Sequence, residues 1–391
     1  MTRKLILLAL ATLTLGACAS RNENIQPPRE LSEITPTIQV HRLWWARIGD
    51  GAGDSGLRLR PAYADGVVYA ASTNGQLRAI DAHSGETLWK SLPPRHGDVD
   101  TRYAGGPSVA DGLVVVGTMD GHVESFDAKT GARGWTANVG AAVVSPPVLV
   151  GEHVLVRTND GNVHALKRAD GSAEWLYDRG NVPLLSLRGN GPLLVANGVV
   201  FFGTDDGKLQ AVRLSDGAPL WQQTVATGEG RTDIAQLNDS DGSLVLDGTT
   251  IYVAAYHGQL LAIEAPTGRP LWNHELSTYT GLAVGGTHVL AVDDSSDIWA
   301  FDTATGDNVW KQDQLEWRWL SAPAVQGEQF VVGDTQGYVH WLNVTDGKFA
   351  ARQRLSHDAI RAQPLVVGNI VFVEDVDGHL AAYQVGTAAG T

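Results

Sequence analysis

The sequence predicts an all-β protein, an eight-bladed β-propeller with four antiparallel strands per blade. The first observation is a hairpin signature that recurs eight times, at intervals of 38 to 51 residues. A repeat of roughly 40–50 residues that holds four short strands is typical of a propeller blade. The second is composition, because 45 glycines and 12 tryptophans among 391 residues favour short strands joined by tight turns.

The hairpin signature joins the two middle strands of each predicted blade. In most copies an Asp-Gly or Asn-Gly pair supplies the positive φ that a tight hairpin turn needs, and β-branched runs flank it. One copy is degenerate, because it lacks the glycine. The eight copies begin at Asn74, Asp120, Asp160, Asp206, His257, Ser295 (the degenerate one), Gln336 and Asp377.

The two remaining strands of each blade flank this hairpin. An inner strand comes first and is often opened by proline, which is acceptable at the first residue of a strand. After the hairpin, a second turn leads to an outer strand with a large aromatic residue. We interpret these rings as structural, because each can bury area against the neighbouring blade. The aromatic residues are Trp89, Trp135, Trp175, Trp221, Trp272, Trp310 and, in the seventh unit, Phe349.

The two ends of the chain predict how the ring closes. The last unit stops near Tyr383 without its aromatic strand, while Trp45 stands near the start with no unit before it. Residues 41–48 can therefore supply the missing outer strand, so that an N-terminal strand completes the last blade and removes an open edge. We expect the propeller over residues 38–386 and a short C-terminal tail at 387–391.

The N-terminus has the pattern of a secretory signal. Two basic residues precede an apolar run that is too short to span a bilayer and that ends in small residues. The only cysteine, Cys18, follows Leu15-Gly16-Ala17, which resembles the lipobox of bacterial lipoproteins. We expect a signal peptide at 1–17, acylation of Cys18 and a flexible tether at 18–37. The alanine after the cysteine implies delivery to the outer membrane, facing the periplasm.

Composition and motifs exclude several classes of protein. With 29 basic and 43 acidic residues the net charge is −14, which argues against a nucleic-acid partner. A single cysteine excludes a disulfide framework or paired thiolates. Gly51, Gly53 and Gly56 fit a dinucleotide-binding pattern, but a strand rather than a helix is expected after them. We therefore expect no catalytic residues, no cofactor and no metal site, and by elimination a binding protein.

Two consecutive connectors depart from the repeat. Connectors from an outer strand to the next inner strand share one face, so unusual connectors gather there. Two interpretations stand for these residues: they form a contact for a protein partner, or the leucines tuck into the blade and the acids solvate a loop. A third, aromatic connector with Trp317 and Trp319 extends the same surface less clearly. The unusual residues are Leu185, Leu187 and Arg188 in the first connector, and Asp239 and Asp241 in the second.

The whole mature chain resembles the BamB family, the lipoprotein propellers of the β-barrel assembly machinery. The signal with Cys18, the tether and the repeats carry the resemblance, together with two connector patterns. Residues 185–189 match the family's S-L-S-L-R-G pattern except that Leu184 stands where a polar residue is usual, and 237–241 match L-S-D-x-D. The resemblance implies docking to BamA through a periplasmic POTRA domain. It assigns the contact to Leu185, Leu187 and Arg188, with Asp239 and Asp241 supporting or orienting it.

The resemblance also implies the function: a subunit that assists folding and insertion of outer-membrane β-barrel proteins. Other subunits of the complex are implied partners, and unfolded outer-membrane proteins are further candidates. Two other hypotheses remain. The repeat is shared with pyrroloquinoline-quinone (PQQ) dehydrogenases, which are longer and carry adjacent cysteines and a calcium site. A propeller scaffold for a cell-envelope ligand is the other.

Overall fold

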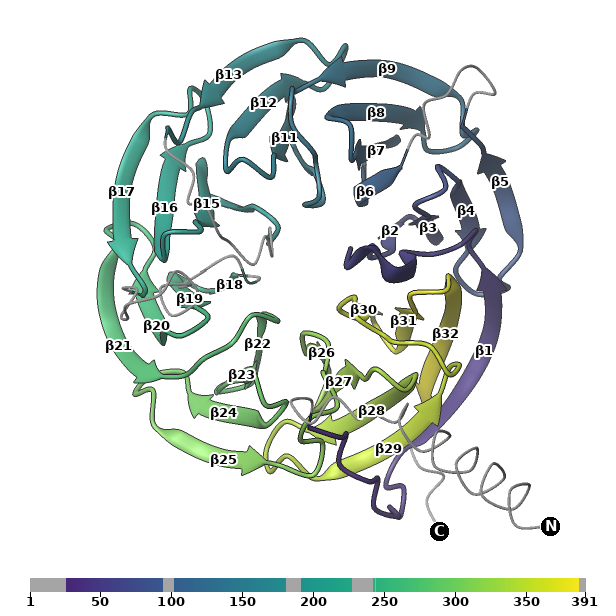
Figure 1. Ribbon diagram of the computed structural model, residues 1–391, viewed down its shortest axis with the longest axis vertical. Helices are drawn as coiled ribbons and strands as arrows, with labels where there is room; N and C mark the ends of the chain where they lie inside the picture. The colour runs from purple at the N-terminus through teal and green to yellow at the C-terminus, as the bar shows by residue number, and fades with distance from the viewer. Residues whose placement is uncertain (1–25, 94–101, 181–190, 227–241, 243, 387–391) are drawn as a thin grey trace, which may run out of the picture.

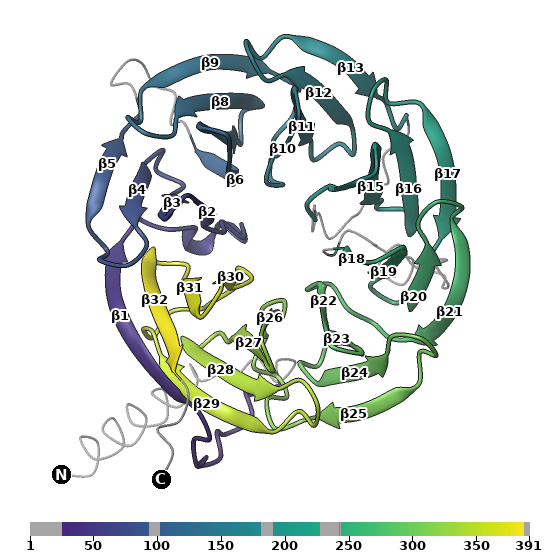
Figure 2. The same cartoon turned by 180° about the vertical axis from the view of Figure 1, so that it is seen from behind.

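The computed structural model describes residues 26–93, 102–180, 191–226, 242 and 244–386. Within them, 32 strands form eight four-stranded antiparallel sheets. Figure 1 shows these sheets arranged as blades around a common axis, with the first strand of each repeat innermost. The predicted eight-bladed propeller is confirmed, and Figure 2 gives the view from the opposite side.

The blades follow the chain order. Blade one has β2 (Ala62–Ala64), β3 (Val67–Ala71), β4 (Leu77–Asp81) and β5 (Thr87–Ser91); blade two has β6 (Tyr103–Ala110), β7 (Leu113–Thr118), β8 (His122–Asp127) and β9 (Arg133–Asn138). Blade three has β10 (Val148–Val150), β11 (His153–Arg157), β12 (Val163–Lys167) and β13 (Ala173–Tyr177); blade four has β14 (Leu194–Ala196), β15 (Val199–Gly203), β16 (Lys208–Arg213) and β17 (Pro219–Thr224). Blade five has β18 (Val245–Asp247), β19 (Thr250–Ala254), β20 (Gln259–Glu264) and β21 (Arg269–Glu275); blade six has β22 (Leu282–Gly285), β23 (His288–Val292), β24 (Ile298–Asp302) and β25 (Asn308–Gln312). Blade seven has β26 (Ala324–Gln326), β27 (Gln329–Gly333), β28 (Tyr338–Asn343) and β29 (Phe349–Arg354); blade eight has β30 (Leu365–Val367), β31 (Ile370–Glu374), β32 (His379–Gly386) and β1 (Gln39–Arg47).

The core lies between adjacent blades. The two middle strands of a blade are almost wholly buried, whereas outer strands such as β17 alternate between exposed and partly buried positions. This is the pattern expected when middle strands pack on both faces and outer strands on one. Eight hydrophobic clusters result, and each is built mainly from the facing strands of two neighbouring blades.

Seven tryptophans form the same contact between one blade and the next, which confirms the structural interpretation of the six that the repeat predicts. The prediction for Phe349 is wrong: Ala351 stands at the equivalent register opposite Trp341, and Phe349 packs on the cluster of blades six and seven. Trp221 of blade four, for example, donates an indole N–H to the Ala265 carbonyl of blade five at 3.1 Å. Its ring covers Gly268, where φ is +74° and an added Cβ would lie 2.6 Å from the indole. Only glycine suits this turn, because it needs both the left-handed backbone and the space. The seven indoles that donate in this way are Trp44, Trp89, Trp135, Trp175, Trp221, Trp272 and Trp310.

The N-terminal strand closes the ring, as expected, because β1 pairs with β32 in the eighth sheet. The tryptophan that contacts blade one is Trp44, not the Trp45 that the spacing favoured. A register shift between Arg42 and Trp44 turns Trp44 inward against Ala382, and Trp45 is left 57% exposed. A β-bulge of this kind reverses which side chains face the core.

Residues 26–37, here called the N-terminal strap, lie against blade seven. Thr37 N–H donates to the Ala350 carbonyl at 2.8 Å, and the side chain of Leu31 packs on a core cluster shared by blades six and seven. The sequence predicts a flexible tether over 18–37, and the strap is the part of it that the structure describes. Among the residues placed by the structure, none belongs to a helix with the length and hydropathy needed to cross a membrane.

A buried polar network in blade seven holds the strap. Asp334, wholly buried, accepts from Arg318 at 2.7 Å and lies 3.0 Å from the His340 ring. Arg318 also donates to the carbonyl of Arg29 at 2.8 Å. Arg352 donates through Nε to Nδ1 of His340 at 3.1 Å, and through Nη1 to the Ser32 carbonyl at 2.8 Å. The two arginines therefore link the strap to one buried carboxylate.

Proton positions in this network follow from the arginine. The Nε–H of Arg352 can only donate, so Nδ1 of His340 accepts and Nε2 carries the hydrogen that is donated to Asp334. Burial lowers the pKa of His340, although Asp334 opposes this shift. Burial alone would raise the pKa of Asp334, but hydrogen bonding to His340 and the charge of Arg318 outweigh it and hold that pKa below its usual value. The network thus contains an ionised Asp334 and a neutral His340.

Candidate partner-binding face

One face of the propeller carries both the connectors between blades and the hairpins between middle strands. Backbone hydrogen bonds join a connector to the hairpin of the same blade, for example in blades two and seven. Val139 N–H donates to Gly121 O at 2.8 Å, and Leu355 N–H donates to Gly337 O at 2.9 Å. A long connector on this face is therefore supported at its base by the adjacent hairpin.

The structure does not place the residues that the sequence assigns to partner binding and lipid attachment. They lie outside the described part of the chain, so their roles stay predictions. These residues are Leu185, Leu187, Arg188, Asp239, Asp241 and Cys18.

The first candidate connector leaves blade three through an ion-pair network. Arg179, at the end of the described segment, lies 3.1 Å from Asp205 and 3.3 Å from Asp206 of the blade-four hairpin. The side chain of Arg179 is only 7% exposed, and Arg157 at the end of β11 lies 3.8 Å from Asp205. Arg179 thus fixes where this connector begins relative to blade four.

The second candidate connector leaves blade four beside the same hairpin. The N–H groups of Val225 and Ala226 both donate to the carbonyl of Gly207, at 2.8 and 2.9 Å. After the connector the chain returns at Gly242 and continues into Leu244, which is buried. The described bases of both connectors therefore meet at one hairpin, residues 204–208, as expected for neighbours on one face.

The blade-four hairpin is electrostatically fixed. Burial tends to raise the pKa of Asp206, but hydrogen bonds from Lys208 and Thr204 and the charge of Arg179 outweigh it, so the pKa is lowered. Sequence reasoning missed Arg179 and Asp205 as supports of the candidate site. The available signal was the doublet Asp205-Asp206 directly before a hairpin glycine, since paired acids in a tight turn need a nearby cation.

The aromatic connector before blade seven is mostly turned inward. Leu315 is fully buried, and Arg318 is 2% exposed in the Asp334 network. Trp319 is 46% exposed and is the large apolar side chain that this connector offers at the surface. This connector therefore adds Trp319 to the exposed surface of the face, rather than both Trp317 and Trp319.

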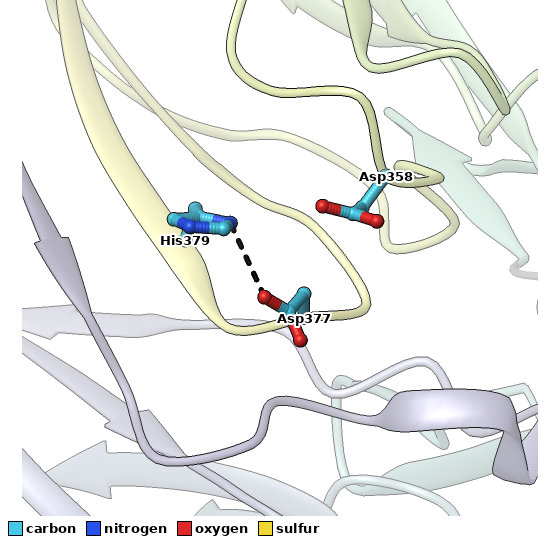
Figure 3. Close-up of side chains that lie close together, drawn as sticks. All are labelled: Asp358, Asp377 and His379. Atoms are coloured by element: carbon cyan, nitrogen blue, oxygen red, sulfur yellow. Dashed lines mark ion pairs between the residues drawn. The ribbon is translucent and has the colours of Figure 1, made fainter.

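Three groups with metal-ligating atoms lie within 4.8 Å of one another: Asp358, Asp377 and His379. Figure 3 shows Asp377 and His379 turned toward each other, with Asp358 approaching from the neighbouring connector. Nδ1 of His379 lies 2.9 Å from Asp375 and 3.9 Å from Asp377, and Arg47 pairs with Asp377 at 2.8 Å. A cation here would face Arg47, so the groups form a charge-paired turn and we assign no metal to them.

Comparison with known proteins agrees with this architecture. The family model described as outer membrane protein assembly factor BamB matches residues 41–98, 73–312 and 309–389. The outer membrane protein assembly factor BamB of Xanthomonas campestris pv. campestris is 39% identical, with 98% of each chain covered. The crystal structure of BamB from Moraxella catarrhalis superposes with a TM-score of 0.79 at 28% identity, over 88% of this chain and all (100%) of that one.

A quinohemoprotein alcohol dehydrogenase from Comamonas testosteroni shares the fold alone. Its TM-score is 0.70 at 12% identity, over 90% of this chain and 77% of that one. Sequence identity therefore separates the two groups of similar proteins, although they share the propeller fold. The chain belongs to the BamB family of outer membrane protein assembly factors.

Proposed function

We propose that this protein is a lipid-anchored, periplasm-facing subunit of the β-barrel assembly machinery at the outer membrane. It docks to BamA through a POTRA domain and assists folding and insertion of outer-membrane β-barrel proteins. The observation that carries this function is the family match, which extends over nearly the whole chain at up to 39% identity. Acylation of Cys18 provides the anchor, since several acyl chains give stable membrane attachment.

The docking surface is the connector face around blade four. Leu185 and Leu187 supply apolar anchors, Arg188 orients them by charge, and Asp239 and Asp241 act from the neighbouring connector. Support comes from the bases of both connectors, which converge on the hairpin of blade four. An interface built on two fixed loop bases loses little entropy when the partner binds.

The test of docking is co-purification of BamA with the Leu187→Asp and Arg188→Ala variants. We expect each to weaken binding by about 30-fold or more while the thermal melt stays unchanged, because interface hot spots contribute about 2 kcal/mol or more. Matched controls are Leu176→Asp and Arg269→Ala, whose side chains are exposed on outer strands of blades three and five. Retained binding by both loop variants with unchanged melts would contradict the assignment.

The protein acts without catalysis. The competing function is a PQQ-dependent dehydrogenase, which the shared fold alone supports at 12% identity. Addition of PQQ and calcium to the purified protein, followed by gel filtration and absorbance spectroscopy, separates the two. A quinone absorbance that elutes with the protein would favour the enzyme.

A further inference from the structure

Two adjoining cavities lie on the axis of the propeller. Their volumes are about 490 and 500 Å³, and they share Arg58, Arg361 and Thr280 in their walls. The larger lining set comes from innermost strands of several blades, including Tyr63 of β2 and Val148 of β10. Residues that end the connectors complete the wall, so the cavities open toward the connector face. Cavities of this size suit small ligands.

The charge of these cavities is opposite to that of the chain. Arg58, Arg60 and Arg361 line them, and no aspartate or glutamate appears among the described lining residues. The whole sequence has 43 acidic against 29 basic residues. A cavity lined by arginines without acids therefore has a charge opposite to the overall charge of the chain. Arg58 and Arg361 are exposed to the cavity, and Arg60 is half-buried.

These arginines have few partners of their own. Arg58 donates to the Tyr279 carbonyl at 3.2 Å. The Nε of Arg60 is buried without a hydrogen-bond partner, and Arg361 forms no hydrogen bond or ion pair with the residues that the structure describes. The protein that surrounds the cavity reduces the hydration of the Arg58 guanidinium and lowers its pKa, and the charge of Arg361 adds to this effect. Arg58 and Arg361 repel each other, and the three guanidinium groups have no carboxylate partner among the described lining residues, so they present unused donors.

Aromatic side chains form the wall next to Arg58 and Arg361. Tyr256 and Tyr279 meet edge to face at 6.3 Å, and Trp319 lines the same cavity with 46% of its surface exposed. Trp319 has a φ of +51°, a conformation that a bulky side chain adopts only when its surroundings impose it. The N–H of Trp319 donates to Ser296 Oγ at 2.8 Å, which holds this backbone. The cavity thus has one basic side and one aromatic side.

We propose that the axial cavity binds a small oxyanion, a carboxylate or phosphate group held by Arg58, Arg60 and Arg361. A guanidinium group binds carboxylate and phosphate through two parallel hydrogen bonds, so these groups satisfy the unused donors and relieve the repulsion between arginines. This site is distinct from the docking surface on the two connectors. A failure of BamA docking therefore does not remove it, nor does its absence affect docking.

The test is isothermal titration of the detergent-solubilised full-length lipoprotein with citrate and, separately, with inorganic pyrophosphate. We expect saturable binding of at least one probe with a Kd below about 1 mM. Arg361→Glu and Arg60→Gln should each weaken binding at least about tenfold, because a charge-assisted hydrogen bond is lost. Arg269→Gln removes an arginine that is 63% exposed and outside the cavity, and it should leave the affinity unchanged.

The two probes distinguish the chemistry of the ligand. Tighter citrate binding assigns the site to carboxylates, and tighter pyrophosphate binding assigns it to phosphates. Arg361→Glu carries little folding risk, since Arg361 is exposed, and ligand-induced stabilisation in thermal melts gives a second readout of binding. Absence of saturable binding with both probes, or equal loss of affinity in Arg361→Glu and Arg269→Gln, would overturn the site.

Discussion

Seven of the eight junctions between blades share one kind of side-chain contact, and the eighth has another. At seven junctions an indole N–H reaches a carbonyl of the next blade, and the ring covers a turn glycine. Between blades seven and eight the equivalent position is Ala351, which pairs with Trp341 of β28, whereas in other blades the outer-strand tryptophan pairs with a small residue of the middle strand. Blade eight also ends at Gly386 of β32, and its outer strand comes from the N-terminus, so the usual turn is absent there.

At this seam the large ring stands on the adjacent middle strand, and the N-terminal strap adds contacts along blade seven. Trp341 of β28 packs edge to face on Tyr383 of β32 at 5.7 Å, and the Asp334 network beneath holds the strap across β29. A repeated sequence solves each junction within the continuous chain in the same way. The junction closed by the N-terminal strand needs its own solution, which here combines the Trp341–Tyr383 contact with a strap that the charged Asp334 network holds.

The largest expected effect comes from removal of the arginine in the seam. Arg318→Met leaves Asp334 buried without its main cation, so we expect the free energy of unfolding to fall by about 3–5 kcal/mol. Urea denaturation of the purified protein measures it. The control is Arg213→Met, which removes an ion pair that is 51% and 49% exposed and should cost under about 1 kcal/mol. Equal effects in the two variants would show that the seam does not depend on buried charge.

The sequence predicts the junctions better than the seam, and the reason is the range of the interactions. Hairpin turns, turn glycines and outer-strand tryptophans are local patterns that repeat, so they indicate the blades directly. The choice of Trp45 over Trp44 failed by one residue, because a bulge in β1 is not visible in the spacing. The strap contacts join Arg29 and Ser32 to partners almost 300 residues or more away, and no repeat encodes such contacts.

The candidate sites divide in the same way. The docking residues were singled out by two connectors that depart from the repeat and were assigned to BamA by resemblance to a family, and they lie outside the described residues. The axial arginines were not predicted at all. Arg58 and Arg361 stand in connectors at opposite ends of the sequence, and only closure of the ring brings their charges close enough to interact.

A fall in pH should destabilise the seam more than the junctions that contain a tryptophan. The pKa of His340 is lowered by burial, so the unfolded chain takes up its proton first as pH falls below the ordinary value of 6.5. Stability is therefore lost between pH 6.5 and the lowered pKa. Compared with His340→Gln, the native protein should lose more stability between pH 7 and pH 5, because the variant has no imidazole that the unfolded chain can protonate. Parallel losses in both proteins would exclude His340 as the source.

Blade eight contains a second buried acid with the opposite sign of pH dependence. Glu374 is 4% exposed, neither carboxylate oxygen has a partner, and burial raises its pKa well above 4.5, with Asp375 adding to the shift. The folded state then favours the protonated acid, so stability falls as pH rises above the ordinary pKa. Glu374→Gln should stabilise by about 1–2 kcal/mol at pH 7 and by nothing near pH 4. Denaturation midpoints of the native protein and the variant at the two pH values measure this gain. A gain that persists at pH 4 would show that it does not come from the ionisation of Glu374.

The smallest effects test the junctions themselves. Trp221→Phe removes one hydrogen bond to Ala265 and keeps most of the ring contact, so we expect a loss of about 1 kcal/mol. The reciprocal change at the seam, Ala351→Trp, should give no comparable gain, because Ala351 is 3% exposed opposite Trp341 in the core cluster of blades seven and eight, where a second indole would overpack the core. Guanidinium denaturation resolves both changes. A gain at position 351 that matched the loss at 221 would mean that the seam is only an ordinary junction with its tryptophan missing, rather than one whose stability comes from Trp341, the strap and the buried Asp334 network.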